Sequence, residues 1–196
     1  MKIIPYGYKT LLIDPPWNET GGGKIRRGAD RHYALMKTAD IMALPVQRLI
    51  HSDGCHLYLW VTNNHLRDGL VVMEKYGFEF KSIITWHKRN SYGLGQYFRG
   101  CTEHVLFGVT PKRLPYKVES GKRQQGVTGF IADRRAHSRK PEELRRMVER
   151  VSYPPYCELF AREQHDGWAC IGNKITGTDI HKVLMALNTG NSRGER

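Results

Sequence analysis

The segment LLIDPPWN, residues 11–18, brings a carboxylate, two prolines and an aromatic ring together directly after an apolar run. Proline lacks an N–H and holds φ at about −65°, so two consecutive prolines cannot continue a central strand or a helix interior. The apolar run therefore predicts a buried strand that ends at Asp14. In an open α/β sheet, ligands bind at the carboxyl ends of the strands, which makes Asp14 a candidate for chemistry.

This group of residues suits the transfer of a methyl group to the exocyclic amine of a nucleobase. The lone pair of such an amine is delocalised into the ring, so the nitrogen is a poor nucleophile. The carboxylate of Asp14 and the carbonyl of Pro15 can each accept one N–H and draw the nitrogen toward sp³ geometry, while Trp17 offers a flat surface to an extruded base. The transfer then depends on alignment and electrostatics. The competing interpretation is a surface turn with a buried tryptophan.

Basic residues outnumber acidic ones, with 31 Lys and Arg against 19 Asp and Glu and a formal net charge of +12. An excess of this size favours a polyanionic partner, most simply nucleic acid, over a basic surface kept for solubility, because the cations cluster in predicted loops. The candidate phosphate contacts are Lys24, Arg26, Arg27, Arg31, Lys88, Arg89, Arg99, Arg134 and Arg135.

Other features of the sequence argue against whole classes of protein. The four cysteines lack C-x-x-C spacing and lie in or beside apolar runs, which predicts buried free thiols in a reducing compartment. The nine histidines form no H-E-x-x-H motif, so we expect no metal site. No apolar run approaches the ~20 residues that span a bilayer, and no signal peptide is evident, which predicts a cytoplasmic protein without membrane contact.

Short apolar runs alternate with helical patterns along the chain. This alternation predicts an α/β fold with a mostly parallel sheet and helices on both faces, in one domain over residues 1–188 with a disordered tail at 189–196. Strands are expected at 9–13, 55–61, 78–88, 103–109, 157–161 and 168–172, helices at 38–50 (with Thr38 as N-cap and a break at Pro45), 66–77, 141–151 (with Pro141 at its first position) and 178–187, and a loop at 110–125.

Eight sequence blocks follow one another in a characteristic order: DPPW, HYALM with IMALPV, LYLWVTNNHL, YGFEFKSIITWHKRN, EHVLFGV, HSRKPEEL, CELFARE and WACIGNK. Over about residues 11–174 the chain resembles the S-adenosylmethionine-dependent adenine-N(6) methyltransferases of the MT-A70 type. That family includes messenger-RNA adenosine methyltransferases and small bacterial and phage DNA adenine methylases. The resemblance implies a Rossmann-like class I methyltransferase fold, S-adenosylmethionine as cofactor and no metal.

The resemblance also implies roles for individual residues. Asp14, Pro15, Pro16 and Trp17 match the catalytic tetrapeptide, and Asp14 also matches a contact to the methionine amino group of the cofactor. The remaining matches are Lys140 at the cofactor carboxylate, Arg162 and Asn173 near its ribose and adenine, Glu158 in support of that cluster, and Lys174 where relatives often carry a Glu or Gln that contacts the ribose.

The implied function is methyl transfer to the N(6) amine of adenine in nucleic acid. DNA is favoured over RNA, because the small basic chain is similar to the bacterial and phage members. An RNA adenine methyltransferase and a non-catalytic nucleic-acid-binding subunit remain the alternatives, and the intact tetrapeptide favours activity over the second of them. The target sequence and the oligomeric state, a homodimer included, stay open.

Overall fold

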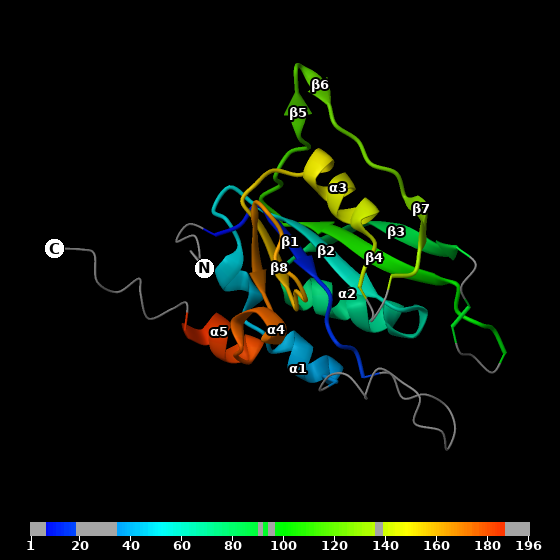
Figure 1. Ribbon diagram of the computed structural model, residues 1–196. Coiled ribbons are helices and arrows are strands. Elements are labelled where there is room, and N and C mark those ends of the chain that lie inside the picture. The colour runs from blue at the N-terminus through cyan, green and yellow to red at the C-terminus, as the bar shows by residue number, and fades with distance from the viewer. Residues whose placement is uncertain (1–6, 19–34, 90–91, 94–96, 136–138, 187–196) are drawn as a thin grey trace.

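The computed structural model describes residues 7–18, 35–89, 92–93, 97–135 and 139–186. A seven-stranded sheet lies at the centre, in the order β7-β3-β4-β2-β1-β8-β9 (Figure 1). Strand β4 runs antiparallel to β2 and β3, and the other neighbouring pairs are parallel. The strands are β1 (Thr10–Ile13), β2 (His56–Val61), β3 (Glu79–Arg89), β4 (Thr102–Val109), β7 (Gly129–Asp133), β8 (Tyr156–Leu159) and β9 (Trp168–Ile171).

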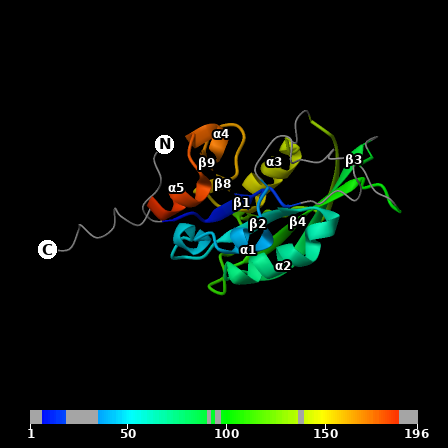
Figure 2. The same cartoon turned by 90° about the horizontal axis from the view of Figure 1, so that it is seen from below.

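Helices cover both faces of this sheet, as the view from below shows (Figure 2). Helix α3 packs on one face, whereas α1, α2 and α5 contribute buried side chains to the core on the other. The helical elements are α1 (Thr38–Met42), η2 (Val46–Leu49), η3 (Asn63–His65), α2 (Leu66–Lys75), α3 (Glu142–Val151), α4 (Asn173–Thr176) and α5 (Ile180–Ala186). The predicted fold class, a mostly parallel α/β sheet, is confirmed. None of the described helices combines the length and the apolar character that crossing a bilayer requires.

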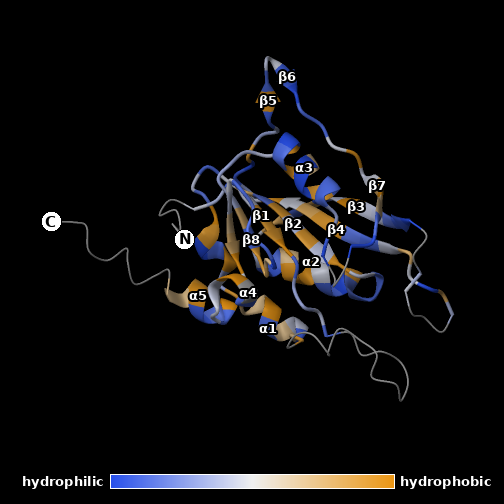
Figure 3. Cartoon of the chain, in the orientation of Figure 1, coloured by the Kyte–Doolittle hydropathy of each residue, from blue (hydrophilic) through white to orange (hydrophobic). Residues whose placement is uncertain are grey.

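Two cores form because side chains alternate between the faces of a strand. In β1, Leu11 and Ile13 join the core under α1, α2 and α5, whereas Leu12 joins the core under α3. All four residues of β1 are buried, which is typical of a central parallel strand covered on both faces. The hydropathy colouring shows the same result, with mostly apolar residues along β1, β2 and β8 (Figure 3).

The structure corrects several local expectations. Lys37, not Thr38, is the N-cap of α1, and Pro141 is the N-cap of α3 rather than its first helical residue. The expected loop at 110–125 contains a small hairpin of β5 (Val118–Glu119) and β6 (Lys122–Arg123).

Two elements, β7 and α4, carried too weak a signal to be expected. Strand β7 buries only Ala132, so its sequence lacks the apolar pattern of the central strands. Helix α4 has four residues, too few to show a helical period. The proposed tail at 189–196 lies outside the described residues.

Candidate functional site

Asp14 lies at the carboxyl edge of the sheet, where β1 stops between its parallel neighbours β2 and β8. Its backbone N–H donates to the Leu159 carbonyl at 3.4 Å, and Pro15 and Pro16 then turn the chain away from the sheet. The Pro15 carbonyl accepts the Trp17 N–H at 2.9 Å. A carbonyl oxygen has a second lone pair, so Pro15 can still accept a further N–H.

A chain of four alternating charges extends from Asp14 across the sheet. Lys140 Nζ lies 3.1 Å from Asp14 Oδ1 and 2.9 Å from Glu103 Oε2, and Lys88 Nζ lies 2.7 Å from Glu103 Oε1. The four side chains are only 14–25 % exposed. Lys140 also lies over the ring of Trp60, 4.9 Å from its centroid. Opposite charges thus compensate one another where water is largely excluded.

The neighbouring opposite charges keep both Glu103 and Lys140 ionised. Burial alone would raise the pKa of Glu103, but the positive charges of Lys140 and Lys88 hold it at about 2. Burial opposes the charge of Lys140, yet Asp14 and Glu103 together raise its pKa above the ordinary value. Burial raises the pKa of Asp14, and the nearby Lys140 acts against that rise. Lys140 is therefore a permanently charged ammonium held between two acids.

Glu158 is a third acid of the site, beside this chain. It lies on β8 in register with Leu12 of β1, two residues before Asp14. Burial, reinforced by the negative charge of Asp14, raises the pKa of Glu158 to about 7. His165 lies beside Glu158, with its Nε2 3.6 Å from Glu158 Oε2. Glu158 is thus the acid of the site that titrates near neutral pH.

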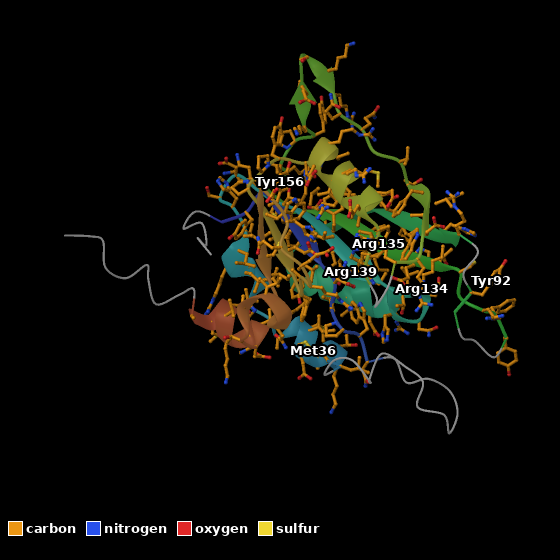
Figure 4. The ribbon with its side chains drawn as sticks, viewed as in Figure 1. Met36, Tyr92, Arg134, Arg135, Arg139 and Tyr156 are labelled. Carbon is orange, nitrogen blue, oxygen red and sulfur yellow. The ribbon has the colours of Figure 1, made fainter. Side chains whose placement is uncertain are left out.

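Two adjoining cavities meet at Asp14. Asp14, Trp60, Arg139, Lys140 and Arg162 line both of them. The smaller cavity, about 50 Å³, extends toward β8 and is also lined by Glu158, Phe160 and His165. The larger one, about 160 Å³, extends over the proline corner and is also lined by Pro15, Pro16, Trp17, Trp86, Lys88, Glu103 and Arg134. Figure 4 shows Arg134, Arg135 and Arg139 gathered where the chain approaches α3.

Trp17 is more buried than a stacking platform requires. Its side chain is 5 % exposed, its Nε1 donates to the Trp60 carbonyl at 2.9 Å, and its ring stacks on His65 with centroids 5.2 Å apart. One face of the ring is therefore covered, and Trp17 reaches the larger cavity only through the little surface that stays exposed. A base on the open face of Trp17 remains a prediction that this conformation does not favour.

The cofactor residues implied by the resemblance separate into three groups. Lys140, Glu158 and Arg162 lie with Asp14 around the two cavities. Asn173, the first residue of α4, is exposed and lines neither of these two cavities. The side chain of Lys174 lies outside what the structure describes.

The candidate phosphate contacts also differ in where the structure places them. Lys24, Arg26, Arg27 and Arg31 lie outside the described residues. Lys88 and Arg89 belong to β3, and Lys88 Nζ lies 2.7 Å from Glu103 Oε1, so Lys88 as a phosphate contact stays a prediction that this ion pair does not favour.

The other candidate arginines are more exposed to solvent than Lys88. Arg89 is 58 % exposed, 3.6 Å from Asp133. Arg134 and Arg99 are exposed, and Arg135 pairs with Glu142 at 3.0 Å.

Sequence reasoning did not single out Glu103 or Trp60 as residues of the site. Glu103 is a single acid in an apolar strand, EHVLFGV, and its position opposite Trp86 on β3 is a matter of strand pairing. Trp60 is indeed buried, at 1 % exposure, but it also lines both cavities. An acid inside an otherwise apolar strand was the one available signal for Glu103, since a buried charge requires a partner. Within the described residues, no cluster of His, Cys, Asp or Glu could hold a metal ion.

Comparison with known proteins identifies the family. The MT-A70 family model matches residues 8–174. The chain is 29 % identical over 183 residues to a probable N(6)-adenosine-methyltransferase MT-A70-like protein of Oryza sativa subsp. japonica, which covers 88 % of this chain and 24 % of that relative. It is 26 % identical over 183 residues to the human N(6)-adenosine-methyltransferase catalytic subunit METTL3, a match that covers 88 % of this chain and 29 % of that relative. It is 26 % identical over 195 residues to the type II methyltransferase M.MunI of Mycoplasma sp., with 88 % and 80 % covered.

The chain belongs to the MT-A70 family. This membership confirms the resemblance drawn from the sequence blocks, and the observed sheet agrees with the Rossmann-like methyltransferase fold that the resemblance implied. The chain spans about a quarter of the length of the rice and human relatives, but most of the length of M.MunI.

Proposed function

We propose that this protein transfers a methyl group from S-adenosylmethionine to the N(6) amine of adenine in nucleic acid, with DNA as the preferred substrate. One observation carries the proposal: Asp14 and Lys140 lie 3.1 Å apart on the shared boundary of two cavities. A donor and an acceptor can therefore approach the same carboxylate from two sides. Membership of the MT-A70 family and the names of the relatives support the chemistry.

The residues fit the cofactor because a buried carboxylate beside a buried ammonium complements an amino-acid zwitterion. Lys140 would hold the carboxylate end and Asp14 the amino end, each exchanging part of its present ion pair for the ligand. Glu103, 2.9 Å from Lys140, keeps the ammonium charged and in place during that exchange. S-adenosylmethionine supplies an electrophilic methyl group on a sulfonium, so the protein needs to align the reactants and offset the change of charge.

Asp14 would also accept an N–H of the target amine, and the free lone pair of the Pro15 carbonyl can accept the other. These two acceptors concentrate electron density on the nitrogen and stabilise the positive charge that develops as the N–C bond forms. Burial strengthens that stabilisation, because fewer waters screen the carboxylate. We assign Trp60, Trp86 and Pro16 to the walls that enclose the base, since all three line the larger cavity.

The preference for DNA rests on the likeness to the type II methyltransferase M.MunI, with which the chain is 26 % identical over 195 residues. RNA adenine methylation is the second candidate, because the rice and human relatives are named adenosine methyltransferases and adenosine is a ribonucleoside. The third candidate, a non-catalytic nucleic-acid-binding protein, is disfavoured by the paired Asp14 and Lys140.

The test is incubation of the protein with isotope-labelled S-adenosylmethionine and single- or double-stranded DNA and RNA oligonucleotides of one sequence, followed by mass spectrometry of the adenine. Label in DNA at N(6) is the expected result. Label in RNA alone selects the second candidate. Binding of the oligonucleotides without label in any of them selects the third and refutes the proposal.

A further inference from the structure

The β3–β4 hairpin forms an arm that projects past the catalytic edge. Strand pairing places Ile13 level with Leu59, Leu59 level with Leu106, and Leu106 level with Ile83. Strand β3 runs parallel to β1 and continues six residues beyond Ile83, to Arg89. At about 3.3 Å per residue, the strand extends roughly 20 Å beyond the level at which β1 ends. Figure 1 shows this hairpin leaving the sheet on the side where the chain emerges from β1.

The stem of the arm is held by backbone hydrogen bonds beyond the last paired strand residues. Lys88 N–H donates to the Cys101 carbonyl at 2.8 Å, and Gly93 N–H donates to the Gly100 carbonyl at 2.7 Å. Gly93 permits this approach, because a Cβ at this position would lie 3.1 Å from the Gly100 oxygen. Arg99 Nε donates to the Gly93 carbonyl at 3.2 Å. These hydrogen bonds fix the stem of the hairpin, so the side chains at its end project from a fixed position.

Aromatic side chains at the end of this arm are almost fully exposed. Tyr97 is 93 % exposed, Phe98 is 91 % exposed and Tyr92 is 63 % exposed. Tyr97 and Phe98 are the most exposed of the large apolar side chains in the described part of the chain. Single apolar residues on a surface are ordinary, but three rings on one projection indicate a contact surface. Figure 4 shows Tyr92 at this end of the molecule, far from the packed core.

The charge of the arm indicates which partner these rings meet. Residues 88–101, KRNSYGLGQYFRGC, include no Asp or Glu. The Arg99 guanidinium carbon lies 5.6 Å from the centroid of the Tyr92 ring, and Arg89 is 58 % exposed. Exposed rings interleaved with arginines suit unstacked bases and their phosphates, because every base has a π face and every nucleotide a negative charge.

We propose that this aromatic arm, Tyr92 with Tyr97 and Phe98, stacks on bases of the nucleic acid at a distance from the target adenine. The inference rests on the proposed function, since it assigns a second contact on the substrate of the same site. A reach of roughly 20 Å corresponds to about six nucleotides at the 3.4 Å rise of a stacked strand, and to fewer where the single strand is extended. The arm therefore contributes only to oligonucleotides that extend that far from the target on one side.

The test compares wild type with Tyr97→Ala/Phe98→Ala on two single-stranded DNA probes. One probe carries two nucleotides on each side of the target adenine and the other carries ten, with 2-aminopurine at successive positions as a fluorescent reporter of stacking. We expect the double variant to bind the long probe about 5- to 150-fold more weakly for each stacked ring lost, and to bind the short probe like wild type. In wild type, 2-aminopurine quenching should be greatest about six positions from the target.

A matched control lies at the opposite edge of the sheet. Tyr116 is 47 % exposed, and the Arg123 guanidinium lies 4.1 Å from its ring centroid, so it repeats the exposed ring and arginine of the arm beside the β5–β6 hairpin. Tyr116→Ala should leave the affinity for both probes unchanged. A second variant, Tyr97→Leu/Phe98→Leu, keeps apolar area without a π face and should lose most of the affinity that the Ala variant loses.

The outcomes separate this inference from the proposed function. Equal affinity of wild type and the Ala variant for the long probe overturns the proposed role of the arm, even when wild type methylates DNA. Light scattering that shows a dimer in wild type and a monomer in the Ala variant also overturns it, because a second copy then covers the rings. Failure of wild type to methylate any probe refutes the proposed function, while the length-dependent loss of affinity still decides the inference.

Discussion

The two faces of the sheet differ in what they bury, although the same strands form both. The face under α1, α2 and α5 buries side chains such as Leu11, Leu57 and Leu59 at 0 % exposure, and its core cluster consists of apolar residues. The face under α3 has an apolar core of its own, but its carboxyl edge carries the charge chain of Asp14, Lys140, Glu103 and Lys88. One face therefore contributes stability through area removed from water, and the other holds charges that are stable only as a set.

This difference teaches how a site can stay charged beside a core. Each acid of the chain has a lysine within 3.1 Å, so no charge is buried without a partner. Removing one ion from such a set leaves the others uncompensated, whereas shortening a leucine on the apolar face only opens a cavity. The two faces should consequently respond differently to substitution: the charged face in activity and ligand affinity as well as in unfolding free energy, and the apolar face in unfolding free energy alone.

The largest expected effect is on activity, at Asp14. Asp14→Asn keeps the shape of the side chain but removes the negative charge, so methyl transfer should fall at least ~100- to 1000-fold, as for the loss of one charge-stabilising group. The fold should remain, because Lys140 keeps Glu103 as its partner at 2.9 Å. Initial rates at saturating cofactor, with circular dichroism as the check on folding, measure this. Turnover near that of wild type would remove Asp14 from the mechanism.

On the apolar face the same comparison predicts a loss of stability without a change in chemistry. Leu57→Ala removes a fully buried side chain next to Leu11, and the free energy of unfolding should fall by about 2–5 kcal/mol. Urea titration measures the loss. Turnover per folded molecule should stay at the wild-type value, and a selective loss of turnover in the folded fraction would show that the two faces are not independent.

Lys140 should affect cofactor affinity as well as stability, because its removal takes the shared cation away from Asp14 and Glu103. Lys140→Met removes the ammonium, and S-adenosylmethionine should bind more weakly by about 1.5–3 kcal/mol, the range for a hydrogen bond to a charged group. Lys75→Met, on the exposed side of α2 and on the other face, is the matched control and should bind like wild type. Isothermal titration calorimetry provides the comparison. Equal affinity of wild type and Lys140→Met would place the cofactor carboxylate elsewhere.

The smallest effect concerns Glu158 and pH. The pKa of Glu158 is raised from 4.5 to about 7, so ionisation is less favourable in the folded protein than in the unfolded chain. Its contribution to stability therefore falls as pH rises from about 4.5 to about 7, and the full penalty applies above that range. At pH 8, the free energy of unfolding of Glu158→Gln should exceed that of wild type by about 1–3 kcal/mol.

Well below pH 4.5, wild type and Glu158→Gln should approach the same stability, because Glu158 is then protonated in both states of the wild-type chain. Chemical unfolding of both proteins at several pH values between 4 and 8 gives the difference directly. A difference that does not change with pH would mean that Glu158 is not the group that titrates.

The sequence predicted the elements that depend on neighbouring residues. Apolar runs located β1, β2, β3, β4, β8 and β9, and the two prolines after Asp14 located the end of β1. Elements without a local signal were missed: β7 buries one residue, and α4 has four. The strand was expected to end at Lys88 because polar and basic residues follow it, but pairing with β7 extends β3 to Arg89. Pairing between strands can thus override a local pattern of polar residues.

By itself, the sequence determined that an acid ends a buried strand, that a rigid corner follows and that cations exceed acids across the chain. These are properties of adjacent residues and of composition, and they require no knowledge of the fold. Only the tertiary structure decided which cations stay available to a partner and which are bound internally. Lys88, Glu103, Lys140 and Asp14 are far apart in sequence, and an ion pair exists only where strand order and the start of α3 bring two charges within a few ångströms.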